Sequence, residues 1–305
     1  MHELSVPVTD RGFLLGLTVA EQLRTFRGRL FRLDQHLGRL ARSLEIVGVT
    51  LPWSSAELSR QASELVADNY RQLGPDSGGD LGLTIFVTPG EGATTPVPGS
   101  TTTSQPFVAM HTRPLAFSTW ADLYETGQPL RIVETRQVPT QCWPAELKCR
   151  SRMHYYLADR EAQAIEPASR ALLLDIEGRV MEASTANVVF YFREEGLVCP
   201  PLECILPGIS VAALQSLAEA GGIPWCHRHV TPEMARAADE VLLCSTSVCV
   251  LPVTSIDGKP IGDGKPGPVF AQLLDAWSQE VGLDIAGQAL ASRDAHKRGT
   301  TEAQP

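Results

Sequence analysis

The spacing of apolar residues in the first part of the chain changes from a strand-like period to a helical one. An extended apolar segment reaches a turn at Arg27–Gly28, and Leu30–Leu33 follows as its partner in a hairpin. Asp34 is then a favourable N-cap, and apolar residues recur on one helical face after it. The pattern predicts helices over 35–47 and 54–73, and strands over 80–88 and 107–112.

Further along, a change in composition at 114–130 indicates a linker between two lobes. Gly92–Gln105 is rich in Thr, Ser, Pro and Gly, so we expect it to be an exposed loop. The remaining predicted strands are 130–135, 171–175, 187–191, 240–244 and 249–254. The remaining predicted helices are 149–164, 211–220 and 267–281.

These elements favour an α+β fold with two domains, because hairpins are more evident than regular βαβ units. We place a small N-terminal α/β domain at 1–117, an interdomain linker at 118–129 and a large C-terminal domain at 130–290. Each domain is expected to be a mainly antiparallel or mixed sheet, or a barrel, with packed helices. The polar end at 291–305 is predicted to be disordered.

Composition narrows the class of partner. The 305 residues are 43% apolar and can bury a large core, and the net charge of -9 argues against nucleic acid and anionic membranes. The seven cysteines include no CxxC pair, and His227–His229 is too short a cluster to predict a metal site. The sequence shows neither a secretory leader pattern nor a membrane-spanning stretch, so we expect a cytoplasmic protein without metal that binds small molecules.

Lysine is scarce in this chain. Among four lysines, only Lys148 lies in a segment that is expected to pack; the others are Lys259, Lys265 and Lys297. An amine near a helix N-terminus and among apolar residues is held in its neutral, nucleophilic form by the helix dipole and by desolvation. Lys148 is therefore a candidate Schiff-base lysine, although composition alone favours a surface lysine in an arginine-rich helix.

Other polar residues are arranged as a phosphorylated pyridine cofactor requires. Glu182 precedes an apolar strand, and a carboxylate at the ring nitrogen holds a proton there. Leu206–Ser210 leads directly into a helix, whose free N–H groups can bind an anion, and Ser245–Ser247 ends a strand with three hydroxyl groups. Arg39 can supply a balancing positive charge. Each feature taken alone is also typical of an ordinary cap, turn or surface residue.

Taken in order, these segments resemble the class IV, or fold type IV, family of aminotransferases that depend on pyridoxal 5'-phosphate (PLP). This family includes branched-chain aminotransferases, D-amino acid transaminases and aminodeoxychorismate lyase. The similarity covers roughly residues 5–280, and its specificity comes from the order and spacing of the motifs together. The segments that carry it are Asp10–Gly16, His36–Leu40, Lys148, Asp175–Asn187, Leu206–Ser210, Asp239–Val241, Ser245–Ser247 and Pro252–Gly258.

The resemblance implies PLP as the cofactor and 130–290 as the PLP-binding domain. It implies that Lys148 forms the Schiff base and moves a proton between the substrate and the cofactor, and that Glu182 pairs with the ring nitrogen. It assigns the phosphate to Arg39, Ile209, Ser210 and Thr246, with Ser247 beside it near the substrate carboxylate. Members of the family are homodimers, so we also expect a homodimer.

Several positions depart from the family pattern near the substrate. Arg152 and Met153 stand where branched-chain enzymes carry Asn-Tyr, so either Tyr155 or His154 contacts the cofactor phenolate, or no residue does. Arg152 also resembles the aminodeoxychorismate lyase subgroup.

Three residues near the N-terminus are assigned to the substrate pocket by the same resemblance. Leu15 and Ala20 replace aromatic residues that are usual in the family, which predicts a wider pocket. Arg24, in contrast, matches the branched-chain pattern.

The function favoured by these features is amino transfer between an amino acid, branched-chain or otherwise hydrophobic, and a 2-oxo acid, within amino acid metabolism. One alternative is a 4-amino-4-deoxychorismate lyase that releases pyruvate and 4-aminobenzoate. A second alternative is a non-catalytic PLP-binding paralogue, against which the retention of both Lys148 and Glu182 argues. The sequence leaves the donor, the acceptor and the L or D stereochemistry open.

Overall fold

The computed structural model describes residues 4–73, 79–92 and 105–302, which form two compact units. The first unit contains the described residues of 1–74, 80–114 and 146–152, and the second those of 75–79, 115–145 and 153–305. One antiparallel sheet and one mixed sheet, each with packed helices, confirm the predicted α+β class. Residues 146–152 thus belong to the first unit, and the domain boundaries inferred from the sequence stay a prediction.

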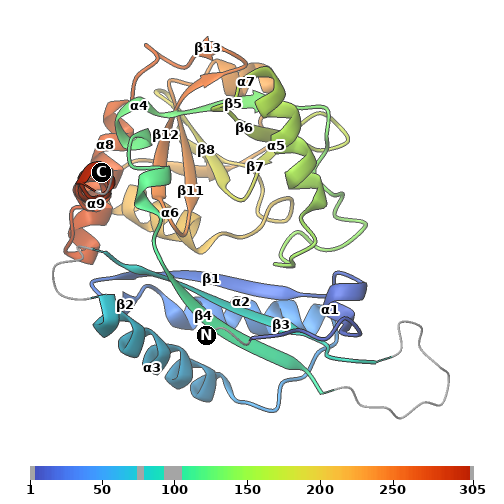
Figure 1. Ribbon diagram of the computed structural model, residues 1–305. Helices are drawn as coiled ribbons and strands as arrows, with labels where there is room; N and C mark the ends of the chain where they lie inside the picture. The colour runs from blue at the N-terminus through green and yellow to red at the C-terminus, as the bar shows by residue number, and fades with distance from the viewer. Residues whose placement is uncertain (1–3, 74–78, 93–104, 303–305) are drawn as a thin grey trace. The chain divides into compact units, whose positions relative to one another are not determined.

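The first unit is an antiparallel sheet with two helices along one face (Figure 1). Its strands follow the order β2-β1-β3-β4. Leu37, Leu40 and Leu44 recur at helical spacing and pack into the core between helix and sheet, as the sequence predicts. The elements are α1 (Arg11–Leu14), β1 (Val19–Phe26), β2 (Arg29–Leu30), α2 (Leu33–Ile46), α3 (Ser55–Leu73), β3 (Leu81–Thr88) and β4 (Phe107–Pro114).

The hairpin between β1 and β2 is closed by a buried carboxylate. Asp80 accepts hydrogen bonds from the backbone N–H groups of Arg27 and Gly28, at 3.1 and 3.0 Å, and from the hydroxyl of Thr25. Arg27 and Gly28 both have a positive φ, of 51° and 75°. Their backbone N–H groups therefore point at Asp80 and not at a neighbouring strand. The predicted hairpin is therefore confirmed, and the start of β3 fixes its turn.

The second unit contains the remaining described elements. They begin with η2 (Phe117–Thr119), α4 (Leu123–Thr126), β5 (Gln128–Ile132), α5 (Met153–Ile165), β6 (Arg170–Leu174), β7 (Val180–Ala183), β8 (Asn187–Phe192) and β9 (Gly196–Cys199). They continue with α6 (Ile209–Ala220), β10 (Trp225–His227), α7 (Pro232–Arg236), β11 (Glu240–Ser245), β12 (Cys249–Ile256), β13 (Lys259–Pro260), α8 (Pro268–Val281) and α9 (Ile285–Glu302).

The strands of the second unit form one mixed sheet that curls on itself. Its order is β10-β9-β8-β11-β12-β5-β6-β7, with β13 paired to β12. A tight turn joins β7 to β8, and in it the backbones of Ala183 and Ala186 exchange hydrogen bonds of 3.0 and 3.2 Å. Thr185 adopts a φ of 62° in this turn. Strand β7, the last in the order, thus lies next to β8, the third strand from the other end.

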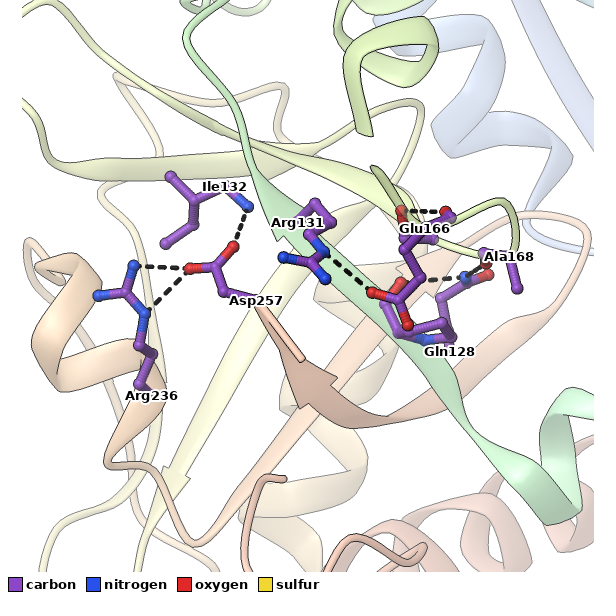
Figure 2. Close-up of polar contacts among 9 residues, drawn as sticks. Gln128, Arg131, Ile132, Glu166, Ala168, Arg236 and Asp257 are labelled. Carbon is purple, nitrogen blue, oxygen red and sulfur yellow. Dashed lines mark hydrogen bonds and ion pairs between the residues drawn. The ribbon is translucent and has the colours of Figure 1, made fainter. Parts of the chain in front are cut away.

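Side-chain contacts fix β5 between its two parallel neighbours, β12 and β6 (Figure 2). Asp257, in the turn after β12, accepts a hydrogen bond from the backbone N–H of Ile132 at 2.9 Å and two from the Arg236 guanidinium at 3.0 and 2.6 Å. Arg131 donates to the carboxylate of Glu166 at 3.0 Å, next to the start of β6. The contacts thus connect α7, β12, β5 and the end of α5.

Two predicted helix starts are wrong. Asp34, expected as an N-cap, lies inside α2, whose N-cap residue is Arg32. The helix expected over 149–164 begins at Met153, because the preceding residues pair with the start of β1. The backbone N–H of Ala20 donates to the carbonyl of Lys148 at 3.0 Å, and that of Arg150 donates to the carbonyl of Thr18 at 2.7 Å. Lys148 therefore lies in an extended segment rather than near a helix N-terminus.

Two other predictions concern the C-terminal segment and the loop over 92–105. Helix α9 continues to Glu302 within the segment that was expected to be disordered, which agrees with its alanine content and lack of proline. Most of the predicted loop over 92–105, namely residues 93–104, lies outside the described residues. Over the described parts of the chain, every helix is too short or too polar to cross a bilayer.

Candidate functional site

Lys148 is half-buried and carries a weakly basic amine. Its backbone N–H donates to the hydroxyl of Ser43 at 3.2 Å, which holds the extended segment against α2. Burial, together with the charges of Arg152, Arg39 and Arg150, lowers the pKa of Lys148 to about 7 against the opposing effect of Glu21. Near neutral pH a large part of this amine is thus unprotonated and nucleophilic.

A buried carboxylate that the sequence analysis did not single out lies beside Lys148. Glu21, on β1, accepts two hydrogen bonds of 2.8 Å from the Arg39 guanidinium and lies 2.7 Å from Nδ1 of His36. Burial alone would raise the pKa of Glu21, but the hydrogen bonds from Arg39 and His36 and the charges of Arg39 and Lys148 lower it to about 2. Arg39 is therefore fixed by a bidentate ion pair.

The residues assigned to the substrate pocket have different surroundings within the first unit. Ala20 is buried on β1, directly opposite the backbone of Lys148. Arg24 is also buried on β1, with its guanidinium 4.1 Å from the centre of the Phe26 ring and Nε donating to the carbonyl of Thr25. Leu15 follows α1 and is exposed.

Glu182 lies on β7 in the second unit and is 4% exposed. Its Oε1 accepts hydrogen bonds from Nε2 of Gln137, at 2.6 Å, and from the hydroxyl of Tyr155. Its Oε2 is 3.3 Å from Nδ2 of Asn187 and 3.4 Å from the backbone nitrogen of Leu206. The structure thus connects the predicted carboxylate with the predicted anion-binding segment that starts at Leu206.

The turn after Glu182 is anchored from two sides. The Ser184 hydroxyl donates to Asp159 of α5 at 2.6 Å, and the same carboxylate oxygen accepts the backbone N–H of Ala171 at 3.1 Å. These contacts connect β7, α5 and β6, so Glu182 and Tyr155 extend from elements that are fixed to each other. Tyr155 therefore contacts a carboxylate, and its predicted contact with a cofactor phenolate stays a prediction.

Helix α6 begins with backbone donors that no side chain caps. Gly208 is the N-cap residue, and it has no side chain to accept from the first turn. A Cβ at this position would lie 2.0 Å from Oδ1 of Asn187, so a capping residue such as serine does not fit. The first helical residues, Ile209 and Ser210, are buried. Uncapped N–H groups at the start of a helix are the type of donor that binds a phosphate group.

Thr246 and Ser247 lie in the turn between β11 and β12, against which α6 packs. Both residues are half-buried, and the turn ends at Cys249 with a φ of 60°. Their hydroxyl groups and that of Ser245 are possible donors to an anion. The second unit thus contains a buried carboxylate, an uncapped helix start and a hydroxyl-rich turn.

These residues suit PLP by their chemistry. The cofactor needs a nucleophilic amine, an acidic partner for its ring nitrogen and donors for its phosphate. Lys148 supplies the first, Glu182 the second, and the start of α6 with its glycine N-cap the third. No group of three or more potential metal ligands is found in the part of the chain that the structure describes.

Comparison with known proteins agrees with this chemistry. The family model for amino-transferase class IV matches residues 18–256. A D-alanine aminotransferase of Bacillus licheniformis is 32% identical over 281 residues, covering 92% of this chain and 93% of that protein. A D-alanine aminotransferase of Staphylococcus aureus (strain MSSA476) is 28% identical, with coverage of 92% and 93%. The chain therefore belongs to the class IV amino-transferase family.

Solved structures agree with this assignment. A branched-chain amino acid aminotransferase from T.th., solved with pyridoxamine 5'-phosphate, has a TM-score of 0.81 and 25% identity, covering 92% of this chain and 90% of that chain. The branched-chain aminotransferase from Thermoproteus uzoniensis with norvaline has a TM-score of 0.79 and 26% identity, covering 94% and 91%. The chain is a PLP-dependent class IV transaminase, and the comparisons do not favour the lyase alternative.

Proposed function

We propose that this transaminase moves an amino group between an amino acid with a hydrophobic side chain and a 2-oxo acid, with Lys148 as the catalytic base. The observation that carries the proposal is the half-buried amine of Lys148, with a pKa of about 7. A group with this pKa exchanges protons readily near neutral pH, which amino transfer requires. The retention of such an amine also argues against a paralogue that only binds PLP.

The other residues are proposed to bind and orient. When bound, PLP supplies an aldehyde for the Lys148 amine and a ring that withdraws electrons from the substrate Cα. Glu182 would hold a proton at the ring nitrogen, and Lys148 would take the proton from the substrate Cα and return it two atoms away, at C4′ of the cofactor. The phosphate is assigned to the N–H groups at the start of α6, together with Arg39, Ile209, Ser210, Thr246 and Ser247.

The substrate class follows from the relatives and from the residues near Lys148. The relatives are named for D-alanine and for branched-chain amino acids, whose side chains are small or apolar. Ala20 lies opposite the backbone of Lys148 and carries only a small apolar side chain. Arg24 and Arg152 are assigned to the substrate pocket with Leu15, and a positive charge there suits the substrate carboxylate.

We also propose a homodimer in the cytoplasm. The first unit exposes large apolar side chains, among them Val8 at 73% and Phe13 at 71%, as expected of a surface that another copy covers. All seven cysteines are free thiols, which suits a reducing compartment.

An amino-transfer assay with PLP-loaded protein tests the function. Transfer from D-alanine or L-leucine to 2-oxoglutarate is measured for the natural chain and for Lys148→Ala, with Lys259→Ala as an exposed control. We expect transfer by the natural chain, a loss of roughly a thousandfold or more in Lys148→Ala, and an unchanged rate in the control. Unchanged transfer in Lys148→Ala would exclude the role assigned to this lysine.

The same assay separates the remaining alternatives. If the protein binds PLP but transfers no amino group from any donor, it is a non-catalytic paralogue. Release of pyruvate from aminodeoxychorismate, without amino transfer, would identify a lyase. The ratio of the rates with D-leucine and L-leucine, which differ only in configuration at Cα, decides the stereochemistry.

A further inference from the structure

Three elements of the second unit direct polar groups at one oxygen of Glu182. Gln137 lies in the loop after β5, Tyr155 in the first turn of α5, and Glu182 on β7. Nε2 of Gln137 is 2.6 Å from Oε1 of Glu182 and 3.2 Å from the hydroxyl of Tyr155, which itself donates to the same Oε1. The three side chains therefore form a closed triangle of hydrogen bonds.

One arrangement of protons satisfies all three contacts of this triangle. The Gln137 amide has two N–H donors, one for Glu182 and one for the Tyr155 oxygen, and the single proton of the Tyr155 hydroxyl points to Glu182. Oε1 then accepts two hydrogen bonds and has no proton of its own. The geometry thus suits an ionised Glu182, because hydrogen bonds to a carboxylate favour its charged form.

Two contacts of the second oxygen of Glu182 are longer. Its contacts with Nδ2 of Asn187 and the backbone nitrogen of Leu206 are 3.3 and 3.4 Å, longer than the usual range for N–H···O hydrogen bonds. Gln137 and Tyr155 therefore provide short contacts that fix the carboxylate.

The side-chain amide of Gln137 is oriented so that its oxygen is left without a hydrogen bond within the described part of the chain. Its backbone N–H donates to the carbonyl of Leu174 at 2.9 Å, and its side-chain Oε1 is buried without a hydrogen-bond partner among the described residues. Turning the amide over would place this oxygen against the Glu182 carboxylate, which is repulsive. Gln137 thus leaves one buried acceptor unsatisfied while it donates to Glu182, and such groups are rare in folded proteins.

We propose that Gln137 and Tyr155 are positioning residues that keep Glu182 ionised and oriented, so that the proton stays on the ring nitrogen of bound PLP. A carboxylate that accepts two hydrogen bonds is a weaker base. The proton shared between Glu182 and the ring nitrogen therefore stays on the nitrogen. This inference rests on the proposed role of Glu182 and extends it to the two side chains that contact Oε1. Removing either donor should make the ring nitrogen less protonated and PLP binding weaker.

The test uses PLP labelled with ¹⁵N in its ring, bound to the full chain. The ¹⁵N chemical shift reports the protonation of the ring nitrogen directly, and a titration gives the dissociation constant of PLP. The variants are Tyr155→Phe, which removes one hydroxyl, and Gln137→Glu, which places a second carboxylate against Glu182. Tyr156→Phe and Gln141→Glu are matched controls, because both residues are exposed neighbours.

We expect the ¹⁵N shift of both variants to move towards the unprotonated value, with PLP binding weakened about tenfold, and neither control to change. A merely structural role would lower stability without moving the ¹⁵N shift of bound PLP. A ring nitrogen that stays fully protonated in Tyr155→Phe, the milder variant, overturns the inference. If the ring nitrogen of the natural chain is itself unprotonated, the proposed role of Glu182 fails as well, so the two failures are distinguishable.

Discussion

A single carboxylate, Glu21, opposes the other influences on the basicity of Lys148. Burial and three arginines lower the pKa of Lys148, and Glu21 raises it, with a net value of about 7. Because this value lies below the usual 10.5, the folded protein holds the amine neutral above about pH 7, whereas an unfolded chain keeps it charged until about pH 10.

The rate at which the PLP-free protein takes up PLP should follow this titration. The nucleophile is the neutral amine, so we expect the rate to rise with pH through a midpoint near 7 and then to level off. Stopped-flow absorbance from pH 5 to pH 10 measures it. A rate that keeps rising up to pH 10 would mean that Lys148 has an ordinary basicity.

Replacing Glu21 with glutamine should have two effects. Its negative charge raises the pKa of Lys148, so without that charge the midpoint of PLP uptake should move below 7. Arg39 would also lose its buried partner, which costs roughly 3–5 kcal/mol and lowers the melting temperature by several degrees. Calorimetry and the uptake assay check both effects. An unchanged midpoint would show that Glu21 does not act on Lys148.

At this scale the sequence predicts some residues and not others. Lys148 can be found because lysine is rare, and Glu182 because its segment resembles a family motif. Glu21 and Gln137 have no such signal. Glu21 contacts residues on a helix that follows in the chain, and Gln137 lies 45 positions before Glu182. Their roles depend on tertiary contacts that local patterns do not encode.

Among the elements, helix α8 has no side chain at its N-cap position, and a residue from another element accepts its first N–H groups. Its N-cap is Gly267, and the buried Glu240 of β11 accepts the backbone N–H groups of Val269 and Phe270 at 2.8 and 2.9 Å. A negative charge there also complements the helix dipole. Helix α8 is thereby attached to β11.

Replacement of Glu240 by glutamine removes the charge and one acceptor. We expect a loss of about 1–2 kcal/mol, measured as a lower melting temperature, whereas the exposed control Glu194→Gln should behave like the natural chain. Equal melting temperatures for Glu240→Gln and the control would show that other contacts hold the start of α8.

The sequence predicts long elements better than short ones. Helices α2 and α3 have a clear apolar face, and β3 is a long apolar run, so their existence follows from periodicity. Strands β7 and β9 are four residues each and buried at every position, so they show neither alternation nor a helical period. The displaced start of α5 has another cause, because the pairing of 148–150 with β1 depends on a distant segment.

For the whole molecule, the exposed apolar side chains of the first unit predict self-association. Sedimentation should give twice the 33.1 kDa mass of the chain. Phe13→Asp should shift the protein towards the monomer, because a charge is costly in a buried apolar interface, whereas the similarly exposed Ile165→Asp on α5 should not. A natural chain that sediments as a monomer would contradict the proposed dimer.

Lys148 is proposed to be the lysine that bonds covalently to the bound cofactor. Reduction of the PLP-loaded protein with borohydride locks the cofactor onto the lysine that holds it, and peptide mass spectrometry then identifies that lysine. We predict the added mass on the peptide that contains Lys148. Added mass on a peptide with Lys259, Lys265 or Lys297 instead, or on none, would contradict it.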